Sequence, residues 1–569
     1  MSLKPTQRSR AQESRAAIQR LYIAMRHLFI RGSYKPLGIS GDAMIESMMQ
    51  LQPEIYGSIS DPERVELEGL LYVYQRLPRG IEECRYIKLI SREGFEKSTF
   101  QPIVPPKRRR NCYRIDQEEM FIEMTRGRSD IYDILTHLTF MYIEAEKIRR
   151  NSEDHKLRKK RDWKMLEEIV RREEEGEEYN KSIAYTYLST LLGRTYEETV
   201  EACRRFDHDP DVNSIFHITY WLGKLSTEEA QQQNDREISF SSALRERIGH
   251  HYYGEIWARN IKEYLAEKDM LGRPVHIISA NPHSVMNSLY ANAALGQKDE
   301  LENLARELSM EDNSEMRHRV LDYALRNGMH QIEDTSGTMI TVQIFDTTQI
   351  RPNKLPPELM WNAEYIAQHK PVILVMDYAF GEQAYETMDE LLKPYELEGQ
   401  RIPLKVESIS IMGKAGILEG GKGDIMVPNA HVFEGTADNY PFDNHLSGAD
   451  FEGHGLNVLE GPMITVLGTS LQNMDILRYF RRSSWKAVGL EMEGAHYQKA
   501  IQAAAKIRKS INENVVLRYA YYASDNPLVT GGTLASGSLG MDGVKPTYMI
   551  TIRILNQILG NHEAGAATA

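Results

Sequence analysis

The sequence predicts an α/β C-terminal domain, built on a central, mostly parallel or mixed twisted sheet flanked by helices, joined to a large and mainly α-helical N-terminal domain. Two observations carry this prediction. Residues 1–255 show the apolar periodicity of helices, whereas strand and helix patterns alternate from residue 337 onward. At 569 residues the chain also exceeds one usual hydrophobic core. We therefore expect a helical cap or assembly domain over 1–255, an α/β connecting segment over 256–336 and a second domain over 337–569.

Composition and charge are those of a globular protein, with 41% hydrophobic and 26% charged residues and a net charge of −12. No apolar run approaches the roughly eighteen residues that cross a bilayer, and the opening MSLKPTQRSRAQESR is too polar for a signal peptide. The negative charge disfavours nonspecific binding to nucleic acid or anionic membrane. Three cysteines without CxxC spacing predict neither disulfides nor a zinc site. We expect a cytoplasmic protein.

In the N-terminal part, DIYDILTHLTFMYIEAEKIRR carries the apolar face of a helix. The basic run PPKRRR at 105–110 suits a solvated loop better than a phosphate-binding arm. His137 and Glu144 share one helical face, and His250 and His251 are adjacent. Neither set is a complete group of metal ligands, so we interpret these histidines as structural.

From residue 273 the pattern changes, because RPVHIISA is typical of a strand and NPHSVMNSLYANAAL of a helix. The helix opens with Asn281 and Pro282, and Ser284 lies near its start. A helix N-terminus that follows a strand can bind phosphate through its free backbone N–H groups. It can equally be a well-capped helix with no ligand.

Further along, strands are predicted at 339–345, 371–377 and 406–413, with a helix at 381–394. These elements indicate an α/β domain. Residues 429–460 are rich in glycine, proline and acids, and predict a long loop or insertion.

The stretch GILEGGKG satisfies the spacing GxxxxGK, but Gly423 stands where a P-loop needs serine or threonine for magnesium. The following GDIMVP continues as a short strand, whereas a P-loop must open a helix. The glycines therefore predict a tight turn or a close backbone approach to a ligand.

Acidic residues gather at two strand ends. The strand in AVGLEMEGAHY ends at Glu491 and Glu493, and a helix follows. The next strand, VVLRYAYYA, stops at a Ser-Asp-Asn-Pro sequence that contains Asp525. A strand-helix-strand unit makes its strands parallel, so we expect these three acids at one carboxyl edge, where open α/β sheets bind ligands.

The series IMGKAGIL, GDIMVP, AVGLEMEGA and YYASDNPL, in that order, resembles the purine nucleoside phosphorylase and nucleosidase superfamily. This superfamily includes AMP nucleosidase and methylthioadenosine/S-adenosylhomocysteine nucleosidase. The resemblance covers about 337–565, and the N-terminal half resembles no family. It implies a phosphorylase-like fold, cleavage of the N-glycosidic bond of a purine nucleotide or nucleoside, no cofactor or metal, and a homo-oligomer, either trimer or hexamer.

The resemblance also implies roles for individual residues. Asp525 matches the acid that protonates the leaving purine at N7, and Glu493 the carboxylate that accepts hydrogen bonds from the ribose hydroxyls, with Met492 against the sugar. We expect Glu382 to orient the water, with Asp377 as second choice. The substrate-phosphate or base pocket is expected to contain Lys414, Gly413, Ser470 and Asn526.

Water and phosphate are alternative nucleophiles in this superfamily. The hexameric phosphorylases hold phosphate with two arginines, at whose positions we place Ile411 and Tyr385. A phosphate dianion would then be poorly paired, so we predict a hydrolase. Lys414 suits a substrate 5′-phosphate and favours AMP. The alternatives are a purine nucleoside phosphorylase and a non-catalytic sensor of purine nucleotides.

Overall fold

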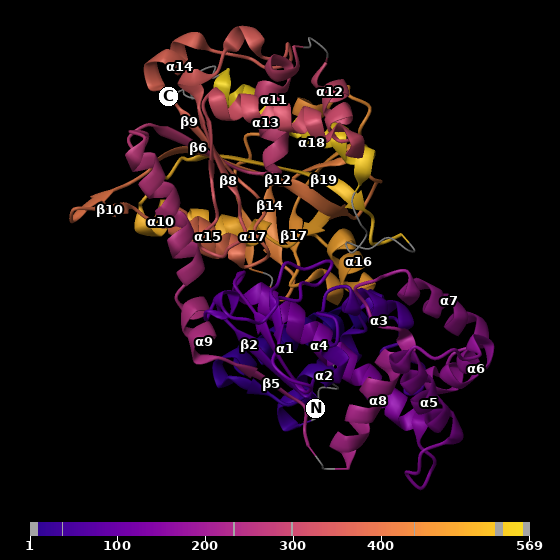
Figure 1. Cartoon of the computed structure of the whole chain (residues 1–569). Coiled ribbons are helices and arrows are strands. Elements are labelled where there is room, and N and C mark those ends of the chain that lie inside the picture. Colours follow the sequence, from indigo (N-terminus) through magenta and orange to yellow (C-terminus); the bar gives the residue numbers. More distant parts are fainter. Residues whose placement is uncertain are drawn as a thin grey trace, which may run out of the picture. The chain divides into compact units, whose positions relative to one another are not determined.

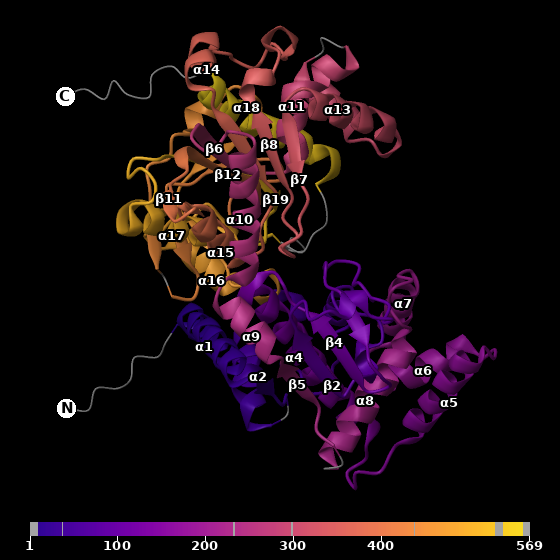
Figure 2. The same ribbon diagram turned by 60° about the vertical axis from the view of Figure 1, so that its left-hand side comes forward.

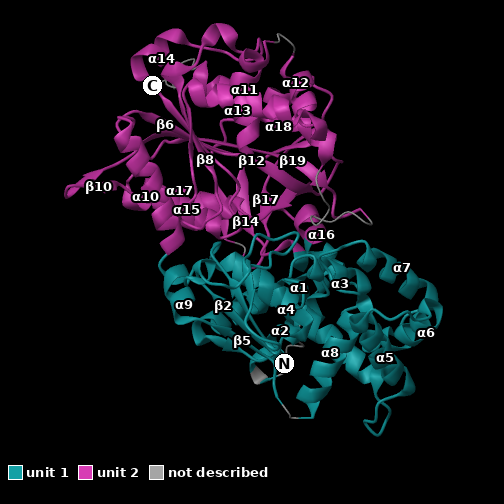
Figure 3. Ribbon diagram, in the orientation of Figure 1, with its two compact units in different colours: residues 1–250, 470–476 teal, residues 251–469, 477–569 magenta. Residues whose placement is uncertain are grey.

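The computed structural model of this chain divides into two compact units (Figures 1 and 3). Unit 1 comprises Met1–His250 and Ser470–Ile476, and unit 2 comprises His251–Thr469 and Leu477–Ala569. Within the described residues, no helix is long and apolar enough to cross a membrane. The structure describes residues 9–36, 38–231, 234–296, 300–436, 438–529 and 539–560.

Unit 1 combines helices with a five-stranded mixed sheet of order β1-β5-β2-β4-β3. Helices α1 and α2 pack side by side, as do α4 and α8 (Figures 1 and 2). The unit 1 helices are α1 (Arg10–Arg31), α2 (Ile39–Leu51), α3 (Leu67–Tyr74), α4 (Gly127–Ser152), α5 (Arg161–Glu175), α6 (Lys181–Leu192), α7 (Tyr196–Asp207), α8 (Ile215–Ala230) and α9 (Ser242–Gly249). Its strands are β1 (Ser33–Tyr34), β2 (Tyr86–Ile90), β3 (Cys112–Arg114), β4 (Glu119–Glu123) and β5 (Glu237–Phe240).

The sheet of unit 1 corrects the prediction of an almost wholly helical N-terminal part. Strand β2 pairs in parallel with both β4 and β5. Each strand has at most five residues, and segments this short show too few alternations to stand out among long helices. The predicted helix over 130–150 is confirmed as α4.

The basic run at 105–110 corrects a second expectation, because two of its arginines are neither solvated nor free for phosphate. Arg110 is 1% exposed, and its Nη2 lies 2.7 Å from Asp130 Oδ1 and 2.6 Å from Asp133 Oδ2. Arg108 Nε lies 3.0 Å from the same Asp133 oxygen. These ion pairs anchor the run to the first turns of α4. His137, one turn further, pairs with Asp133 and fits its predicted structural role.

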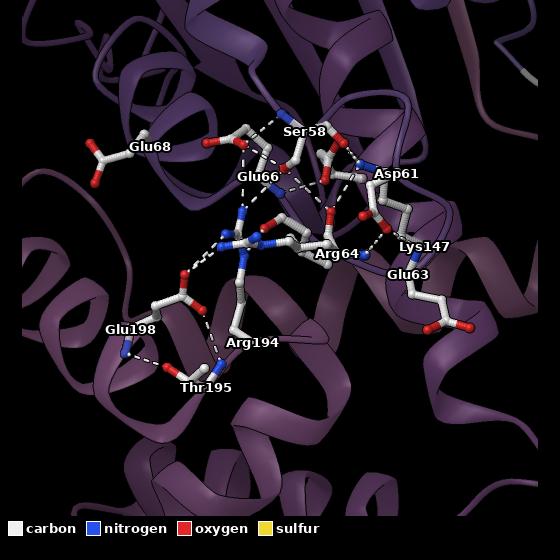
Figure 4. A network of polar contacts seen from close by, with 12 residues as sticks. Ser58, Asp61, Glu63, Arg64, Glu66, Glu68, Lys147, Arg194, Thr195 and Glu198 are labelled. Carbon is white, nitrogen blue, oxygen red and sulfur yellow. Dashed lines mark hydrogen bonds and ion pairs between the residues drawn. The ribbon is translucent and has the colours of Figure 1, made fainter. Parts of the chain in front are cut away.

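A second polar network fixes the segment before α3 (Figure 4). Glu66 accepts a hydrogen bond from the Ser58 backbone N–H, and Lys147 of α4 donates to the Ser58 carbonyl oxygen. Arg194 points toward Glu66 and Glu198, at nitrogen–oxygen distances of 3.4 and 3.5 Å (Figure 4). Glu198 also completes the capping box of α7. The network thus joins three separate helices.

The segment Ser470–Ile476 is part of unit 1 although it follows most of unit 2 in the sequence. Asn473 donates from Nδ2 to the Leu51 carbonyl oxygen at 2.6 Å, and the Gln472 carbonyl accepts from the Glu54 N–H at 2.9 Å. The Met474 N–H donates to the Glu54 carboxylate. These bonds satisfy backbone groups at the end of α2.

Unit 2 is a mixed sheet with helices on both faces. One apolar core lies under α10, α15 and α17, and another under α11, α13 and α18 (Figure 1). The helices are α10 (Tyr252–Glu267), α11 (Pro282–Leu295), α12 (Leu301–Leu308), α13 (Ser314–Arg326), α14 (Ala363–His369), α15 (Gln383–Leu391), α16 (Met474–Arg482, beginning in unit 1), α17 (Gly494–Gln502) and α18 (Val544–Leu559).

The large sheet of unit 2 has twelve strands. Nine of them follow the order β15-β14-β17-β18-β12-β6-β9-β8-β7. In addition, β19 pairs with β12 and β13, and β13 also pairs with β16. Two further strands, β10 and β11, form a separate hairpin. The strands are β6 (Pro274–Ser279), β7 (Met329–Ile332), β8 (Val342–Asp346), β9 (Val372–Met376), β10 (Tyr395–Leu397), β11 (Gln400–Ile402), β12 (Lys405–Ile417), β13 (Ile425–Val427), β14 (Ala430–Phe433), β15 (Asn439–Pro441), β16 (Val458–Glu460), β17 (Met463–Thr465), β18 (Gly489–Glu491) and β19 (Val516–Asp525).

Strand β6 lies between β12 and β9 and runs parallel to both. Residues 256–336 therefore belong to the same sheet as 337–569 and are not a separate connecting segment. The physical reason is the apolar run of β6, whose residues Val275 and Ile277 are fully buried as in a central strand. The predicted loop over 429–460 also contains strands, namely β14, β15 and β16.

The direction of β18 corrects the expected parallel arrangement. Strand β19 runs parallel to β12, but β18 runs antiparallel to it. The reason is the length of β12, whose thirteen residues include an irregularity at Ala415/Gly416. Bulges bend a strand and increase its twist, so the end of β12 can accept a neighbour that runs in the opposite direction.

Candidate active site

The strands that carry the predicted acids flank the end of β12 in spite of this reversed strand. Gly416 pairs with Asp525 of β19 on one edge and with Leu490 of β18 on the other. Neighbouring strands lie about 4.8 Å apart, so the two strands that carry the acids are separated by roughly 10 Å. Asp525 therefore lies on one side of the end of β12, and Glu491 lies on the other side.

Asp525 carries a buried carboxyl group at the end of β19. The residue is 3% exposed, and its Oδ1 lies 2.5 Å from the hydroxyl oxygen of Ser524. Its Oδ2 is buried and has no hydrogen-bond partner among the described residues. Burial raises the pKa of Asp525, and the Ser524 bond and the charges of Lys414 and Lys422 offset this only in part. The carboxyl therefore holds a proton to higher pH than a solvated aspartate.

Glu491 shapes the turn from β18 into α17. Its carboxylate accepts hydrogen bonds from the backbone N–H groups of Glu493 and Gly494 and from the hydroxyl of Thr465. Helix α17 begins at Gly494, where a Cβ would lie 2.2 Å from Cδ2 of His431. Only glycine leaves room for that imidazole. Glu491 thus holds the backbone at the start of α17.

Glu493 faces the loop between β9 and α15. Its Oε1 accepts a hydrogen bond of 2.9 Å from the Gly381 N–H, and Gly381 has a positive φ of 56°. Burial and the nearby charge of Glu491 raise the pKa of Glu493 to about 8. Burial likewise raises the pKa of Glu491 to about 7, although Glu491 accepts three hydrogen bonds. Two adjacent carboxyl groups of this kind titrate as a coupled pair.

Glu382 follows Gly381 and is the N-cap residue of α15. Its place in the chain brings it next to the loop that binds Glu493. Asp377 lies at the start of the same loop, where its Oδ1 accepts a hydrogen bond from the Tyr378 N–H. The loop thus contains both predicted water-orienting residues.

Two tyrosines near these acids were missed by the sequence analysis. Tyr378 is 40% exposed, and a Cβ on Gly413 would lie 3.2 Å from its ring, so Gly413 makes room for this aromatic side chain. Tyr497 of α17 has its hydroxyl 3.0 Å from that of Ser279 at the end of β6. The available signal for Tyr378 was its place two residues after the apolar run of β9, next to Asp377. No local sequence pattern pointed to the contact between Tyr497 and Ser279.

Lys414 lines a cavity of about 900 Å³ in unit 2. The cavity also contacts Tyr522, Gln343 and the start of α11, where the Asn281 side chain accepts from the His283 N–H. Oε1 of Gln343 is buried and lacks a hydrogen-bond partner within the part of the chain that the structure describes. The start of α11 predicted from the sequence is confirmed and lies beside a cavity.

Three further predicted site residues are Ser470, Asn526 and Met492. Ser470 is buried in unit 1, where it forms a hydrogen bond with the Tyr56 hydroxyl, whereas the other predicted site residues belong to unit 2. Asn526 donates to the Gly420 carbonyl and accepts from the Leu528 N–H, which fixes the loop after β19. Met492 is 9% exposed between the two glutamates.

Across the described ranges, two groups of acidic and histidine side chains are close enough to share a metal ion. One is Glu82, Glu83 and His217 in unit 1, and the other is His251, Asp389 and Glu390 in unit 2. Neither group includes Asp525 or Glu493.

A family model described as "Family of unknown function (DUF6909)" matches residues 42–323 and 305–560. The chain belongs to this family. No curated protein matches this DUF6909 chain.

Solved structures that are similar to the DUF6909 chain cover about half of it. One is the 5′-methylthioadenosine/S-adenosyl homocysteine nucleosidase of Campylobacter jejuni, which is 12% identical in sequence. The match covers 50% of this chain and 99% of the nucleosidase, with a TM-score of 0.31. Another is the futalosine hydrolase of Helicobacter pylori, which is 13% identical in sequence. The match covers 50% of this chain and 98% of the hydrolase, with a TM-score of 0.30. A third is the Helicobacter pylori nucleosidase of the first type, with 12% identity, 50% and 99% coverage and a TM-score of 0.29.

Proposed function

We propose that unit 2 is a purine-nucleotide N-glycosidase with a phosphorylase-like fold, similar to AMP nucleosidase, which uses water to release the free base and ribose 5-phosphate. A purine nucleoside would give ribose in place of ribose 5-phosphate. The observation that carries the proposal is Asp525, a buried carboxyl with a raised pKa, one of whose oxygens has no hydrogen-bond partner among the described residues. It lies across Gly416 from the strand that leads to Glu493.

Asp525 supplies the proton to the leaving base. Cleavage of the N-glycosidic bond moves an electron pair onto the purine, whose N7 then needs a proton or a strong hydrogen bond. Burial raises the pKa of the Asp525 carboxyl, which makes its protonated form available at higher pH than in a solvated aspartate, and general acid catalysis contributes about 10²–10⁴-fold. A purely structural aspartate would have both oxygens satisfied, whereas Oδ2 of Asp525 has no protein donor among the described residues.

Glu493 binds the sugar. One carboxylate oxygen is held by Gly381, and hydroxyl groups of a ribose can donate to the carboxylate. Such donors favour the ionised form of Glu493, and the ionised form stabilises the positive charge that develops on the sugar. The raised pKa near 8 means that ribose binding is accompanied by proton release at neutral pH.

Lys414 and the cavity of about 900 Å³ are proposed to accommodate the substrate phosphate. The lysine supplies one positive charge, and the first turn of α11 adds backbone N–H groups and the positive end of the helix dipole. Tyr378 offers an exposed aromatic face to a base. This combination favours AMP over an uncharged nucleoside.

Two positions were predicted to lack the phosphate-binding arginines of the phosphorylases, and of these only Ile411 supports water as the nucleophile. Tyr385 matches the other arginine position only if β9 is the first strand of the fold, whereas unit 2 begins with β6. Ile411 supplies no guanidinium, and a desolvated phosphate without partners costs several kcal/mol. Glu382, beside Gly381, is proposed to orient the water.

A substrate panel in ¹⁸O water tests this function. We expect AMP to give adenine at full rate in phosphate-free buffer, with the label on the C1 oxygen of ribose 5-phosphate, because water attacks C1. Chromatography of the base and mass spectrometry of the sugar provide the readout. Strict dependence on added phosphate would favour a phosphorylase, and tight nucleotide binding without turnover would favour a sensor.

Glu493→Gln is expected to lower turnover on AMP, and to lower it less on dAMP, because the amide is uncharged and the missing 2′-hydroxyl removes one hydrogen bond. The kcat/KM ratio of AMP to dAMP should therefore fall relative to the unmodified protein. Glu513→Gln, at an exposed position, provides the control. An equal loss on both substrates would refute the sugar-binding role of Glu493.

A further inference from the structure

Unit 1 contains a compact group of potential metal ligands. Glu82 and Glu83 end the 3₁₀ helix Ile81–Glu83, and His217 lies in the first turn of α8. One ligand atom from each residue lies within 4.8 Å of the others. Nε2 of His217 is 2.9 Å from Glu83 Oε1 and 3.8 Å from Glu82 Oε1. Imidazole nitrogen and carboxylate oxygen are both ligand atoms of zinc sites.

Glu82 gives an independent indication that something is bound there. The residue is 1% exposed, and its Oε1 accepts a hydrogen bond of 2.6 Å from Nδ2 of Asn213. Its Oε2 is buried and finds no hydrogen-bond donor among the residues that the structure describes. A buried carboxylate oxygen without a donor costs free energy, and buried charges are normally paired or coordinate metals. A cation beside Glu82 would satisfy this oxygen.

The surroundings of the three residues suit a bound ion. Glu83 uses its second oxygen to pair with Arg114 at 2.9 Å, an outer partner of the kind that orients a ligating carboxylate. Glu83 and Asn213 also line a cavity of about 600 Å³. Arg79 and Arg114 line this cavity as well, and Glu83 is the one residue of the three candidate ligands that borders it. The cavity gives room beside Glu83 to water molecules that can complete the coordination of an ion.

We propose that Glu82, Glu83 and His217 bind a divalent first-row transition metal ion of the Zn²⁺ type, with water from the adjoining cavity as the remaining ligand. The imidazole favours Zn²⁺ over Mg²⁺ and Ca²⁺, which prefer sites made of oxygen ligands alone. This site lies in unit 1 and is independent of the proposed glycosidase chemistry of unit 2.

The second candidate group, in unit 2, provides a contrast. Asp389 lies 2.7 Å from a guanidinium nitrogen of Arg508, and Glu390 lies 2.5 Å from Nζ of Lys393. Protein cations thus already balance both carboxylates of this group. We expect it to bind metal much more weakly, so His251 serves as the matched control position.

The experiment uses the full chain, freed of metal by a chelator and titrated with Zn²⁺ in a calorimeter. We expect one tight site, whose affinity falls at least about 100-fold in Glu82→Gln and in His217→Gln and is unchanged in His251→Gln. Mg²⁺ should not compete at equal concentration. No tight site in the unmodified protein, or equal affinity in all three variants, would overturn the proposal. Circular dichroism checks that the variants are folded.

A second readout keeps the test decisive if a ligand variant fails to fold. The ring of Trp221, one turn after His217 on α8, has its centroid 6.2 Å from that imidazole. Co²⁺ at the proposed site should therefore quench the fluorescence of Trp221, and Zn²⁺ should reverse the quenching. Trp221→Phe should abolish the Co²⁺-dependent change. Quenching that persists in Trp221→Phe, or no quenching in the unmodified protein, would contradict the site.

Discussion

Asp525→Asn is expected to lower kcat for AMP by at least about 100-fold and to leave KM nearly unchanged. An amide is almost isosteric with the carboxyl but cannot donate the proton that the leaving purine needs, and removal of a general acid costs about 10²–10⁴-fold. Steady-state kinetics with chromatographic detection of adenine measures the effect. The thermal midpoint should stay close to that of the unmodified protein, because Oδ2 has no partner to lose among the described residues.

The pH profile sharpens this test. The pKa of Asp525 is raised by burial, so the acid form is fully present below the ordinary pKa and is lost as pH rises through the folded-state pKa. Turnover should therefore fall on the alkaline side, and Asp525→Asn should lack that descending limb. Asp269→Asn, at an exposed residue after α10, is the control. Undiminished turnover in Asp525→Asn would remove this residue from the chemistry.

Arg110→Met is expected to destabilise unit 1 by about 3–5 kcal/mol, because it leaves Asp130 and Asp133 buried with less compensating charge. The side chains of Arg110 and Asp130 are each 1% exposed, and that of Asp133 is 6% exposed. Burial opposes ionisation of both aspartates, but the neighbouring arginines outweigh it and hold each carboxyl pKa below 3.8. Denaturant unfolding monitored by circular dichroism measures the loss.

Two further variants distinguish the effect of buried charge on stability from the general effect of replacing an arginine. Arg109→Met changes the adjacent but exposed arginine and should alter stability by less than about 0.5 kcal/mol. Adding Asp130→Asn to Arg110→Met removes one uncompensated charge and should recover part of the lost stability. The stabilising contribution of these aspartates is present above pH 3.8 and is lost as pH falls toward their lower folded-state pKa values. Equal stability of the Arg109 and Arg110 variants would refute this account.

Most of the unit 2 core elements follow from the sequence. The predicted strands over 339–345, 371–377 and 406–413 match β8, β9 and β12 to within a few residues. These strands carry near-continuous apolar runs, because both faces of the sheet are covered by helices. The acids at the ends of β18 and β19 stand out for the same reason, since a charge directly after a buried strand is unusual.

Long-range pairing is what the sequence does not reveal. The direction of β18 is set by its pairing with the end of β12, which lies some seventy residues earlier in the sequence. Arg110 looks solvated in the sequence because its partners, Asp130 and Asp133, belong to a helix that begins well after it. The orphan oxygens of Glu82 and Asp525 are likewise visible only when the whole surroundings are known.

Because Ser470–Ile476 belongs to unit 1, this unit depends during biosynthesis on residues that are translated late. The Leu51 carbonyl and the Glu54 N–H receive their partners from Asn473 and Gln472. A nascent chain that has just left the ribosome with all of 1–250 still lacks those partners. Translation at about 5–20 residues per second supplies them only after a delay on the order of tens of seconds. Unit 1 therefore reaches its final hydrogen bonding after most of unit 2 has been translated.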